Sequence, residues 1–342
     1  MIRCANVVTL LLVLHISVMS YSEDIFDKPQ LISLYEKAKE EGKAIIWGTD
    51  SREVDWIPQA VGERFPGIEV IVFGDLNSST RLIAESRAGR NQVDIFWSSL
   101  SSSITVFERG LFDRVDWSLY GIQTGSTALE GTMAYTNNVV YTIVYKAGSG
   151  EKVRLPEKWS DLLDAEYHNK MAGTPFLMPR LVAALGQSWG REEAIRYSRK
   201  LRDDAGLLLT RVPLDQLLLS GEREYALGVL DQLPQQWKRN GAQLEYIIPE
   251  PVVVVQFGAS VLSKSPHPNA ARLIAAWLAS PEGKLAREKA TFAKDYRPGS
   301  PSPSVVALHK KGLEFIYDTT DQLKERNSLI AEVNSILLGQ SE

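Results

Sequence analysis

Residues 222–251, EREYALGVLDQLPQQWKRNGAQLEYIIPEP, predict a strand, a polar turn, a helix and a return strand. The apolar runs 225–230 and 244–248 fit the two strands, and a proline and a glycine bracket the helix between them. Asp231 and Gln232 form the polar turn. In open α/β sheets such turns often bind small molecules, because side chains and the unpaired N–H groups of the following helix meet there. The pattern also fits an ordinary strand-to-helix connection, and both interpretations stay open at this point.

The N-terminal segment, residues 1–22, is typical of a secretory signal peptide. Arg3 precedes an apolar run over residues 5–18, and the small residues Ser20 and Ser22 follow it. The run is too short for a comfortable membrane span, so we expect cleavage after Ser20 or Ser22. The sequence therefore predicts a periplasmic protein, with a retained N-terminal anchor as the alternative.

The composition of the exported chain excludes several kinds of catalytic and metal site. Cleavage removes the single cysteine, Cys4, and Arg3, so the 38 basic residues become 37 against 42 acidic ones and the net charge moves from −4 to −5. A cysteine-free exported chain of roughly 320 residues suits a bacterial periplasmic protein with two lobes, each held by its own core. Cysteine catalysis and cysteine-based zinc sites are excluded. Since the charges are scattered and mildly acidic, nucleic acid is not an expected partner.

Strands and helices alternate in the first hundred residues of the exported chain. The apolar runs 44–47, 68–73 and 93–97 predict three parallel strands with helices on both faces of the sheet. Polar turns follow all three, and the carboxyl ends of parallel strands share one edge, so the turns should line a common crevice. Helix capping alone would also explain such residues. They are Thr49 and Asp50 after the first strand, Ser78, Ser79 and Thr80 after the second, and Ser98 and Ser99 after the third.

The middle of the chain predicts a second lobe. Residues 133–146 read as one long strand that leaves the first lobe, and residues 155–221 are rich in helix. Two apolar strands within 249–262 return the chain, and a Pro-, Gly- and Ser-rich segment, 297–304, predicts a surface loop. We therefore expect a discontinuous first lobe of residues 23–138 and 247–342, a second lobe of residues 139–246, and a hinge of two crossings.

Seven stretches follow one another over nearly the whole exported chain: LYEKAKEEGKAIIWGT, RFPGIEVIVF, LIAESRAGRNQVDIFWSS, LPEKWSDLLDAEYHNKMAG, SGEREYALGVLDQ, KRNGAQLEYIIPEP and SKSPHPNAARLIAAWLASPEGK. Their order and spacing resemble the extracellular solute-binding proteins of ABC importers, in the ferric-iron-binding-protein-like branch of the type II periplasmic binding proteins. The resemblance implies an α/β fold of two lobes, each a mostly parallel sheet flanked by helices. It also implies that a monomer closes its lobes on a small-molecule solute and delivers it to a membrane permease.

The resemblance also implies where the solute binds. Besides the three turns of the first lobe, it points to the crossover strand and to two turns of the second lobe. Iron-binding members place two adjacent tyrosines where this chain has Asp231 and Gln232, and no adjacent tyrosine pair exists anywhere in the sequence. We therefore expect no bound metal and no cofactor, and keep ferric iron as the alternative cargo. The implied positions are Tyr135, Asn137 and Asn138 on the crossover strand, with Thr174, Asp231 and Gln232 in the two turns.

The residue types favour a small polar organic solute, anionic or zwitterionic. Asp50 and Asp231 could bind an amine, whereas the helix N-termini could bind a carboxylate, phosphate or phosphonate. Trp47 lies at a strand end, where its ring could cover an organic solute or pack in the core.

Two other classes of protein remain as alternatives. An enzyme is not expected, because the sequence lacks GxSxG, HExxH, P-loop and CxxC motifs. His168, His267 and His309 have polar neighbours and read as surface positions, so we predict no catalytic residues. A binding protein that serves a receptor instead of a permease would have the same sequence pattern.

Overall fold

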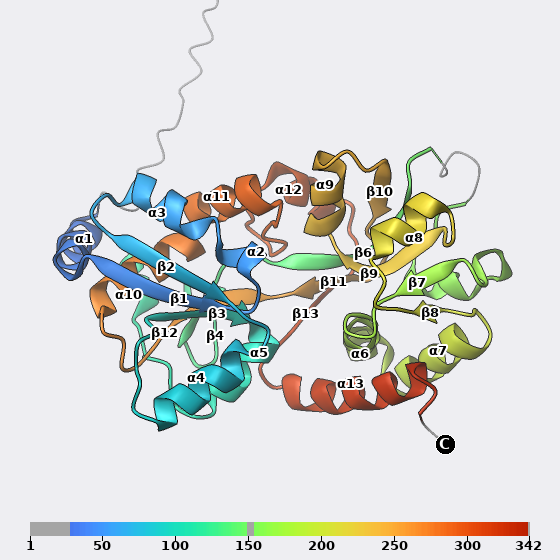
Figure 1. The fold of residues 1–342 in the computed structure, drawn as a ribbon, viewed down its shortest axis with the longest axis horizontal. Coiled ribbons are helices and arrows are strands. Elements are labelled where there is room, and N and C mark those ends of the chain that lie inside the picture. The colour runs from blue at the N-terminus through green and yellow to red at the C-terminus, as the bar shows by residue number, and fades with distance from the viewer. Residues whose placement is uncertain (1–27, 149–153, 341–342) are drawn as a thin grey trace, which may run out of the picture.

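The computed structural model describes residues 28–148 and 154–340, which form two lobes joined by three passages of the chain (Figure 1). The predicted signal peptide, residues 1–22, lies outside the described residues. No helix within these two ranges is both long enough and apolar enough to cross a membrane.

The sheet of the first lobe has the strand order β2-β1-β3-β12-β5-β4. β1 is parallel to β2 and β3, whereas β12 is antiparallel to β3 and β5, and β4 to β5. The three parallel strands predicted from the sequence correspond to β1, β2 and β3, and their carboxyl ends share one edge of the sheet. The strands are β1 (Lys43–Gly48), β2 (Glu69–Gly74), β3 (Ile95–Ser99), β4 (Thr127–Ala128), β5 (Met133–Tyr135) and β12 (Phe257–Val261).

Helix α10 (Pro268–Ala279) forms the centre of the first lobe's core. All of its residues from Leu273 to Ala279 are buried, and the Trp277 ring packs on Trp56 and Phe65 with centroids 5.9 and 6.3 Å apart. Its alanines let α1 and β12 pack closely against it. The other helices of this lobe are α1 (Pro29–Glu41), α2 (Ser51–Val54), α3 (Ile57–Arg64), α4 (Ser78–Arg87), α5 (Leu100–Phe107), α11 (Pro281–Thr291) and the 3₁₀ turns η2 (Trp117–Tyr120) and η3 (Thr124–Ser126).

Strand β6 (Val139–Lys146) is the central strand of the second lobe. Its residues Val139 to Tyr145 are buried, as expected for a strand covered on both faces, and it is antiparallel to β9, β10 and β11. The main path of the sheet is β13-β11-β6-β9-β7-β8. The remaining strands are β7 (Met171–Gly173), β8 (Leu208–Leu209), β9 (Tyr225–Leu230), β10 (Leu244–Ile247), β11 (Val252–Val255) and β13 (Phe315–Tyr317).

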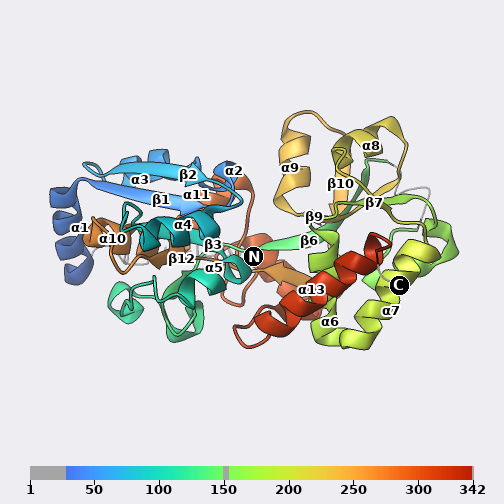
Figure 2. The ribbon, with the colours of Figure 1, turned by 60° about the horizontal axis from the view of Figure 1, so that its bottom comes forward.

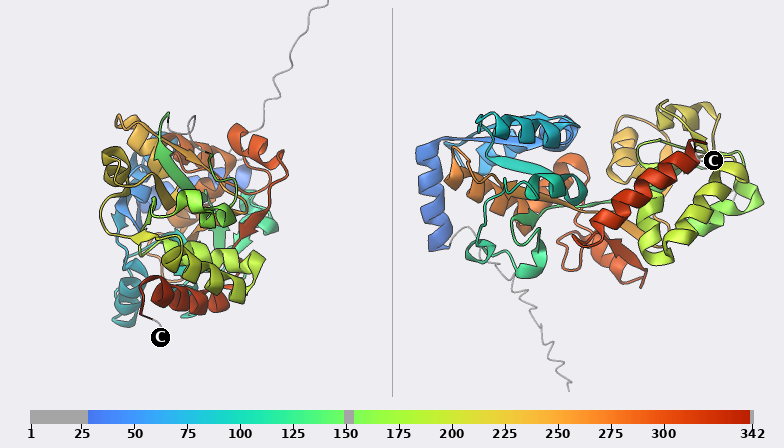
Figure 3. Two further views of the ribbon diagram at one scale, coloured as in Figure 1. Left: turned by 90° about the vertical axis from the view of Figure 1, so that its right-hand side faces the viewer. Right: turned by 90° about the horizontal axis from the view of Figure 1, so that it is seen from below.

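The C-terminal helix α13 (Leu323–Leu337) packs along α6 and α7, as Figures 2 and 3 show. Leu329, Val333 and Leu337 complete the core of the second lobe. The expectation that all of 247–342 lies in the first lobe is therefore wrong for this helix, whose apolar pattern did not reveal which lobe it covers. It is also wrong for β11 and β13, which belong to the sheet of the second lobe. The other helices of the second lobe are α6 (Met178–Trp189), α7 (Arg191–Asp203), α8 (Leu214–Ser220), α9 (Gln232–Arg239) and the 3₁₀ turns η4 (Trp159–Leu163) and η5 (Ala165–Tyr167).

The hinge has three passages, one more than predicted. The first, residues 136–138, interrupts the long strand expected over 133–146, because Asn137 and Asn138 direct their side chains into buried hydrogen bonds. The second is Gln256, between β11 and β12. The third runs from α11 through α12 (Pro303–His309) and β13 to α13.

The segment 297–304, predicted as a surface loop, is exposed at Pro298, Gly299, Pro303 and Ser304 but turns three other side chains inward behind the hinge. Arg297 is 9% exposed, and Ser300 and Ser302 are buried. An ion pair between Arg297 and Asp295 fixes the start of this segment, a contact that composition alone does not reveal.

Candidate functional site

A cavity of about 480 Å³ lies between the two lobes, and we call it the cleft. Its first wall comes from the turns after β1 and β3, and its second from β6, α6 and α13. The lining residues from the first lobe are Thr49, Asp50, Glu53, Leu76, Ser99, Ser101, Ser102 and Phe257, and those from the second lobe and the hinge are Tyr141, Phe176, Leu177, Arg180, Leu230, Val255, Arg326, Asn327 and Ile330.

Two of the predicted turns form the first wall. The Asp50 carboxylate caps α2 by accepting the Arg52 N–H at 3.0 Å, and it pairs with the Arg52 guanidinium at 2.6 Å. Burial acts to raise the pKa of Asp50, but these contacts with Arg52 outweigh it and leave the pKa below its usual value. Ser99 caps α5, and its Oγ accepts the Ser102 N–H at 3.3 Å. The hydroxyls of Ser99, Ser101 and Ser102 are thus gathered at the first turn of α5.

The second wall provides a guanidinium and a phenol. Arg180, in the first turn of α6, lies over the Phe176 ring with Cζ 3.8 Å from the ring centroid, and its Nη1 donates to the Phe176 carbonyl at 2.6 Å. Burial lowers the pKa of Arg180, yet a guanidinium stays charged in a protein. Burial raises the pKa of Tyr141 to about 12, so its hydroxyl is protonated and can donate a hydrogen bond.

Most charges around the cleft are already paired. Glu53 accepts hydrogen bonds from Gln232 and from Arg287, the latter at 2.6 Å, and Arg326 pairs with Asp318. Within the described ranges Arg180 has no carboxylate partner. The cleft therefore presents one uncompensated positive charge beside several hydroxyl groups.

Apolar side chains lie at the cleft from both lobes. Leu76 is 72% exposed and Phe176 is 52% exposed, and Phe257 and Ile330 also line the cavity. A cavity with apolar walls and a few placed polar groups is suited to an organic molecule.

Three of the predicted site residues, Thr49, Asp50 and Ser99, line the cleft. Thr174 lies next to it, where its Oγ1 accepts the Leu177 N–H at 3.1 Å. Ser79 also remains close, since its hydroxyl donates to the Ser102 carbonyl at 3.1 Å.

The turns also contain residues that do not reach the cleft. Trp47 is in the core, where its ring packs on Phe73 and lies under the Arg81 guanidinium. Ser78 and Ser98 are buried, and Thr80 is exposed on α4. These four side chains are neighbours in sequence of residues that lie at the cleft, but they do not line it. The sequence pattern of the turns does not show which residues reach the cleft.

The predicted crossover residues hold the hinge. Asn137 donates to the carbonyls of Lys284 and Ala293 at 2.8 Å, and Asn138 donates to Asp295 at 2.7 Å. Tyr135 lines a different cavity. Asparagine amides form hydrogen bonds with buried backbone groups as readily as with a solute. Residue type alone therefore did not show that Asn137 and Asn138 hold the hinge.

Asp231 and Gln232 were predicted to contact the solute but have structural roles. The Asp231 carboxylate is fully buried, accepts the Tyr296 hydroxyl at 2.6 Å and accepts the Val140 N–H at 3.1 Å. Burial raises the pKa of Asp231 to about 6. Gln232 reaches across the lobes to Glu53.

Sequence reasoning missed Tyr141, Arg180 and Arg326. Arg180 had a usable signal, because it is the single charged residue in the apolar run 176–186, FLMPRLVAALG. Arg326 had none, since α13 was assigned to the other lobe. The three histidines lie outside the cleft lining, and each accepts or donates a hydrogen bond elsewhere.

The described residues contain no group of three or more His, Cys, Asp or Glu side chains that could hold a metal ion. In the cleft, Asp50 and Glu53 are paired with arginines, which leaves the Tyr141 oxygen as a possible hard ligand. The groups present therefore fit an anion better than a bare ferric ion.

Residues 63–293 match a family model described as bacterial extracellular solute-binding protein. No curated protein matches the chain. Among solved structures, iron-bound HitA from Pseudomonas aeruginosa matches with a TM-score of 0.66 and 18% identity over 85% of this chain and 99% of that one.

Two further solved structures share the fold. Apo ferric ion-binding protein A from Pasteurella haemolytica matches with a TM-score of 0.70 and 14% identity over 86% of this chain and 98% of that one. The substrate-binding protein of an ABC transporter from Agrobacterium tumefaciens has a TM-score of 0.69 and 17% identity over 86% and 94% of the two chains. At these identities the likeness establishes the two-lobed fold.

Proposed function

Because the chain belongs to the family of bacterial extracellular solute-binding proteins, we propose that it captures a small organic anion in the cleft and delivers it to an ABC permease. Membership in this family implies a periplasmic location. The family is one of binding and transport proteins and is not a known class of enzyme.

The observation that supports an anionic solute is the uncompensated Arg180 guanidinium. It lines the same cavity as the hydroxyls gathered at the first turn of α5, where the helix also carries partial positive charge. A carboxylate or phosphate group bound between them would receive donors from both lobes, and the protonated Tyr141 hydroxyl could supply another. The rest of the solute would contact Leu76 and Phe176.

Donors from both lobes also suggest how the solute is held. A molecule that contacts both walls binds best when they are close, so its binding shifts the population toward the closed arrangement. Small-angle scattering should show a smaller radius of gyration at saturating solute. An unchanged radius would contradict capture by lobe closure.

A thermal-shift screen of the exported protein tests the solute class. Phosphonates, phosphate esters and small carboxylates should raise the melting temperature, whereas their neutral amide or alcohol analogues should not. Arg180→Met should weaken binding of the best hit by roughly tenfold to a hundredfold, since hydrogen bonds to charged groups contribute about 1.5–3 kcal/mol.

Arg196→Met is the matched control, because Arg196 is an exposed arginine on α7 that pairs with Glu193. It should leave the affinity unchanged. Equal affinity of the wild type and Arg180→Met for every anion that binds would contradict the proposed role of the guanidinium.

A ferric ion, alone or with an organic anion, is the second candidate. Two observations favour it: Tyr141 lines the cleft, and solved structures with the same fold include ferric-binding proteins. A tyrosine bound to iron(III) gives a visible absorption band. Addition of ferric citrate should produce such a band, absent in Tyr141→Phe, if iron is the cargo. A thermal shift with iron-free citrate that shrinks in Arg180→Met, with no visible band, would favour the organic anion.

A further inference from the structure

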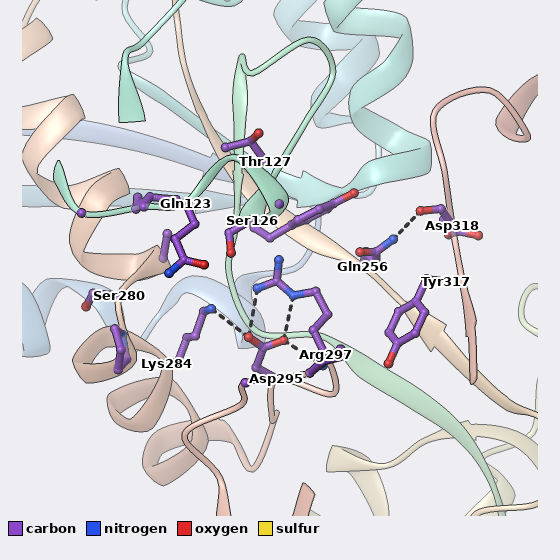
Figure 4. Close-up of a pocket in the computed structure, with 18 of the residues that line it drawn as sticks. Gln123, Ser126, Thr127, Gln256, Ser280, Lys284, Asp295, Arg297, Tyr317 and Asp318 are labelled. Carbon is purple, nitrogen blue, oxygen red and sulfur yellow. Dashed lines mark hydrogen bonds and ion pairs between the residues drawn. The ribbon is translucent and has the colours of Figure 1, made fainter. Parts of the chain in front are cut away.

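A second and larger cavity, of about 830 Å³, lies behind the hinge and shares no lining residue with the cleft. We call it the rear cavity; Figure 4 shows it. It lies between η3, the start of α11, the segment 295–299 and the end of β13. At the second hinge passage, Val255 and Phe257 line the cleft while Gln256, between them, lines the rear cavity. Successive residues of an extended chain point to opposite faces, so the two cavities lie on opposite sides of this passage.

Two buried cations and one carboxylate form the floor of the rear cavity. Lys284 and Arg297 both pair with Asp295, with Nζ 2.8 Å and Nη2 2.9 Å from Oδ2. Burial acts to raise the pKa of Asp295, but the hydrogen bonds and charges of its two partners outweigh it and leave the pKa below its usual value. Asp318 also lines the cavity, but its carboxylate pairs with Arg326 on the cleft side. This floor therefore has an excess of positive charge.

The floor also has hydrogen-bond donors without acceptors. The Arg297 side chain is 11% exposed, and its Nη1 is buried with no hydrogen-bond partner among the described residues. Figure 4 shows that this nitrogen points away from Asp295. Lys284 carries three N–H bonds and has Asp295 as its ion-pair partner. A buried donor left unpaired is costly, so an acceptor in the cavity would be stabilising.

The walls add aromatic surface. The Arg297 guanidinium lies over the Tyr135 ring, with Cζ 4.6 Å from the centroid, and Tyr317 lines the opposite side. A volume of this size with a polar floor and aromatic walls suits a small organic molecule. We propose that the rear cavity is a second binding site, for a small organic oxyanion whose carboxylate or phosphate group is bound by Arg297 and Lys284.

The test uses Arg180→Met as the background, so that binding in the cleft is weakened, and the variants that follow identify binding in the rear cavity. Citrate and inorganic phosphate are titrated by calorimetry at constant ionic strength. We expect citrate to bind this protein. Lys284→Met should weaken that binding by roughly tenfold to a hundredfold, because it removes one charged hydrogen-bond donor. Asp295 keeps Arg297 and Asn138 as partners in this variant.

A second variant fills the cavity without touching the floor. Gly125 lines the rear cavity, has an ordinary φ and has open space where a side chain would begin. Gly125→Trp should abolish citrate binding while the melting temperature stays near that of the background. Gly62→Trp is the matched control, since Gly62 on α3 has the same open surroundings and lies outside the cavity lining.

Loss of citrate binding in Lys284→Met and Gly125→Trp, but not in Gly62→Trp, would support the rear site. Phosphate binding with the same pattern would show that the oxyanion alone is sufficient. No binding of either probe to the background protein, or binding that survives both substitutions, would overturn the proposal. These outcomes do not depend on the cleft, whose role is tested by the affinity lost on Arg180→Met itself.

Discussion

The cleft and the rear cavity are both lined by arginine and tyrosine, yet they are built differently. In the cleft, Arg180 comes from the second lobe and the hydroxyls come from the first, so the arrangement of donors depends on the distance between the lobes. In the rear cavity, Arg297 and Lys284 are fixed by one carboxylate, Asp295. The cleft is thus suited to sense a change in lobe position, whereas the floor of the rear cavity keeps its shape through its own ion pairs.

Substitution of Arg287 tests whether one buried side chain stabilises the structure around both cavities. Arg287 lies on α11 with Lys284, donates to the Asn137 carbonyl in the hinge at 2.8 Å, and pairs with Glu53 in the cleft wall at 2.6 Å. Arg287→Met leaves the buried Glu53 carboxylate without its cation, so we expect the free energy of unfolding to fall by about 3–5 kcal/mol. Urea denaturation measures this loss.

Arg114→Met is the control, because it breaks an exposed ion pair with Glu130 and should change stability little. Similar losses in the two variants would show that burial of the Arg287 pair has no special weight. That result would contradict the hypothesis that Arg287 supports the structure of both cavities.

Asp231 lies at the hinge between the cavities, and its carboxyl group should make the free energy of unfolding depend on pH. Burial raises the pKa of Asp231 to about 6 in the folded protein, against a usual value near 3.8, despite hydrogen bonds from Tyr296 and Val140 and the nearby charges of Lys294 and Arg287. Between these values the folded state binds more protons than the unfolded state. The stability contributed by this group is therefore greater below about pH 4 and is lost as the pH rises through about 6, by on the order of 3 kcal/mol.

Asp231→Asn removes this titration. The difference in unfolding free energy between the wild type and this variant should therefore shift in favour of the variant as the pH rises from 4 to 7, when urea curves are compared at each pH. A difference that stays constant over this range would mean that the carboxylate titrates alike in both states.

Tyr141→Phe should give the smallest effect and should act on the cleft alone. It removes one neutral hydroxyl, worth about 0.5–1.5 kcal/mol in a hydrogen bond, so the affinity for an organic anion should fall roughly twofold to tenfold. Tyr145→Phe on the same strand is the control, because that hydroxyl bonds Glu245 outside the cleft lining. An equal fall for both variants, or weaker citrate binding at the rear cavity, would remove the distinction between the sites.

The sequence predicted the first wall of the cleft better than the second. The first wall follows from local rules, since the turns after parallel strands meet at one edge, and Thr49, Asp50 and Ser99 are found there. The second wall depends on which lobe α13 covers and on how α6 is rotated, and both are set by packing between distant segments. Arg180 and Arg326 could therefore not be placed from periodicity.

The hinge was predicted as a feature but not in its details. Alternation of apolar runs indicated crossings near 138 and near 246. The first lies at residues 136–138, but the second lies at Gln256, because β11 still pairs with β6 in the sheet of the second lobe. The third passage was not predicted, and within it only 297–304 was given a structure, that of a surface loop. The path of this passage depends on contacts such as Arg297 with Asp295 and Tyr296 with Asp231, which join segments whose proximity only the folded structure shows.

The hydrogen bond from Gln232 to Glu53 crosses between the lobes and requires no solute. If the lobes move as proposed and this contact breaks when they separate, it stabilises the closed arrangement of the empty protein as well as that of the loaded one. The empty protein then divides between open and closed populations, and the rate of solute entry falls in proportion to the open fraction. A permease would then encounter some closed molecules that carry no solute. The strength of the hydrogen bond from Gln232 to Glu53 would influence the fraction of such molecules.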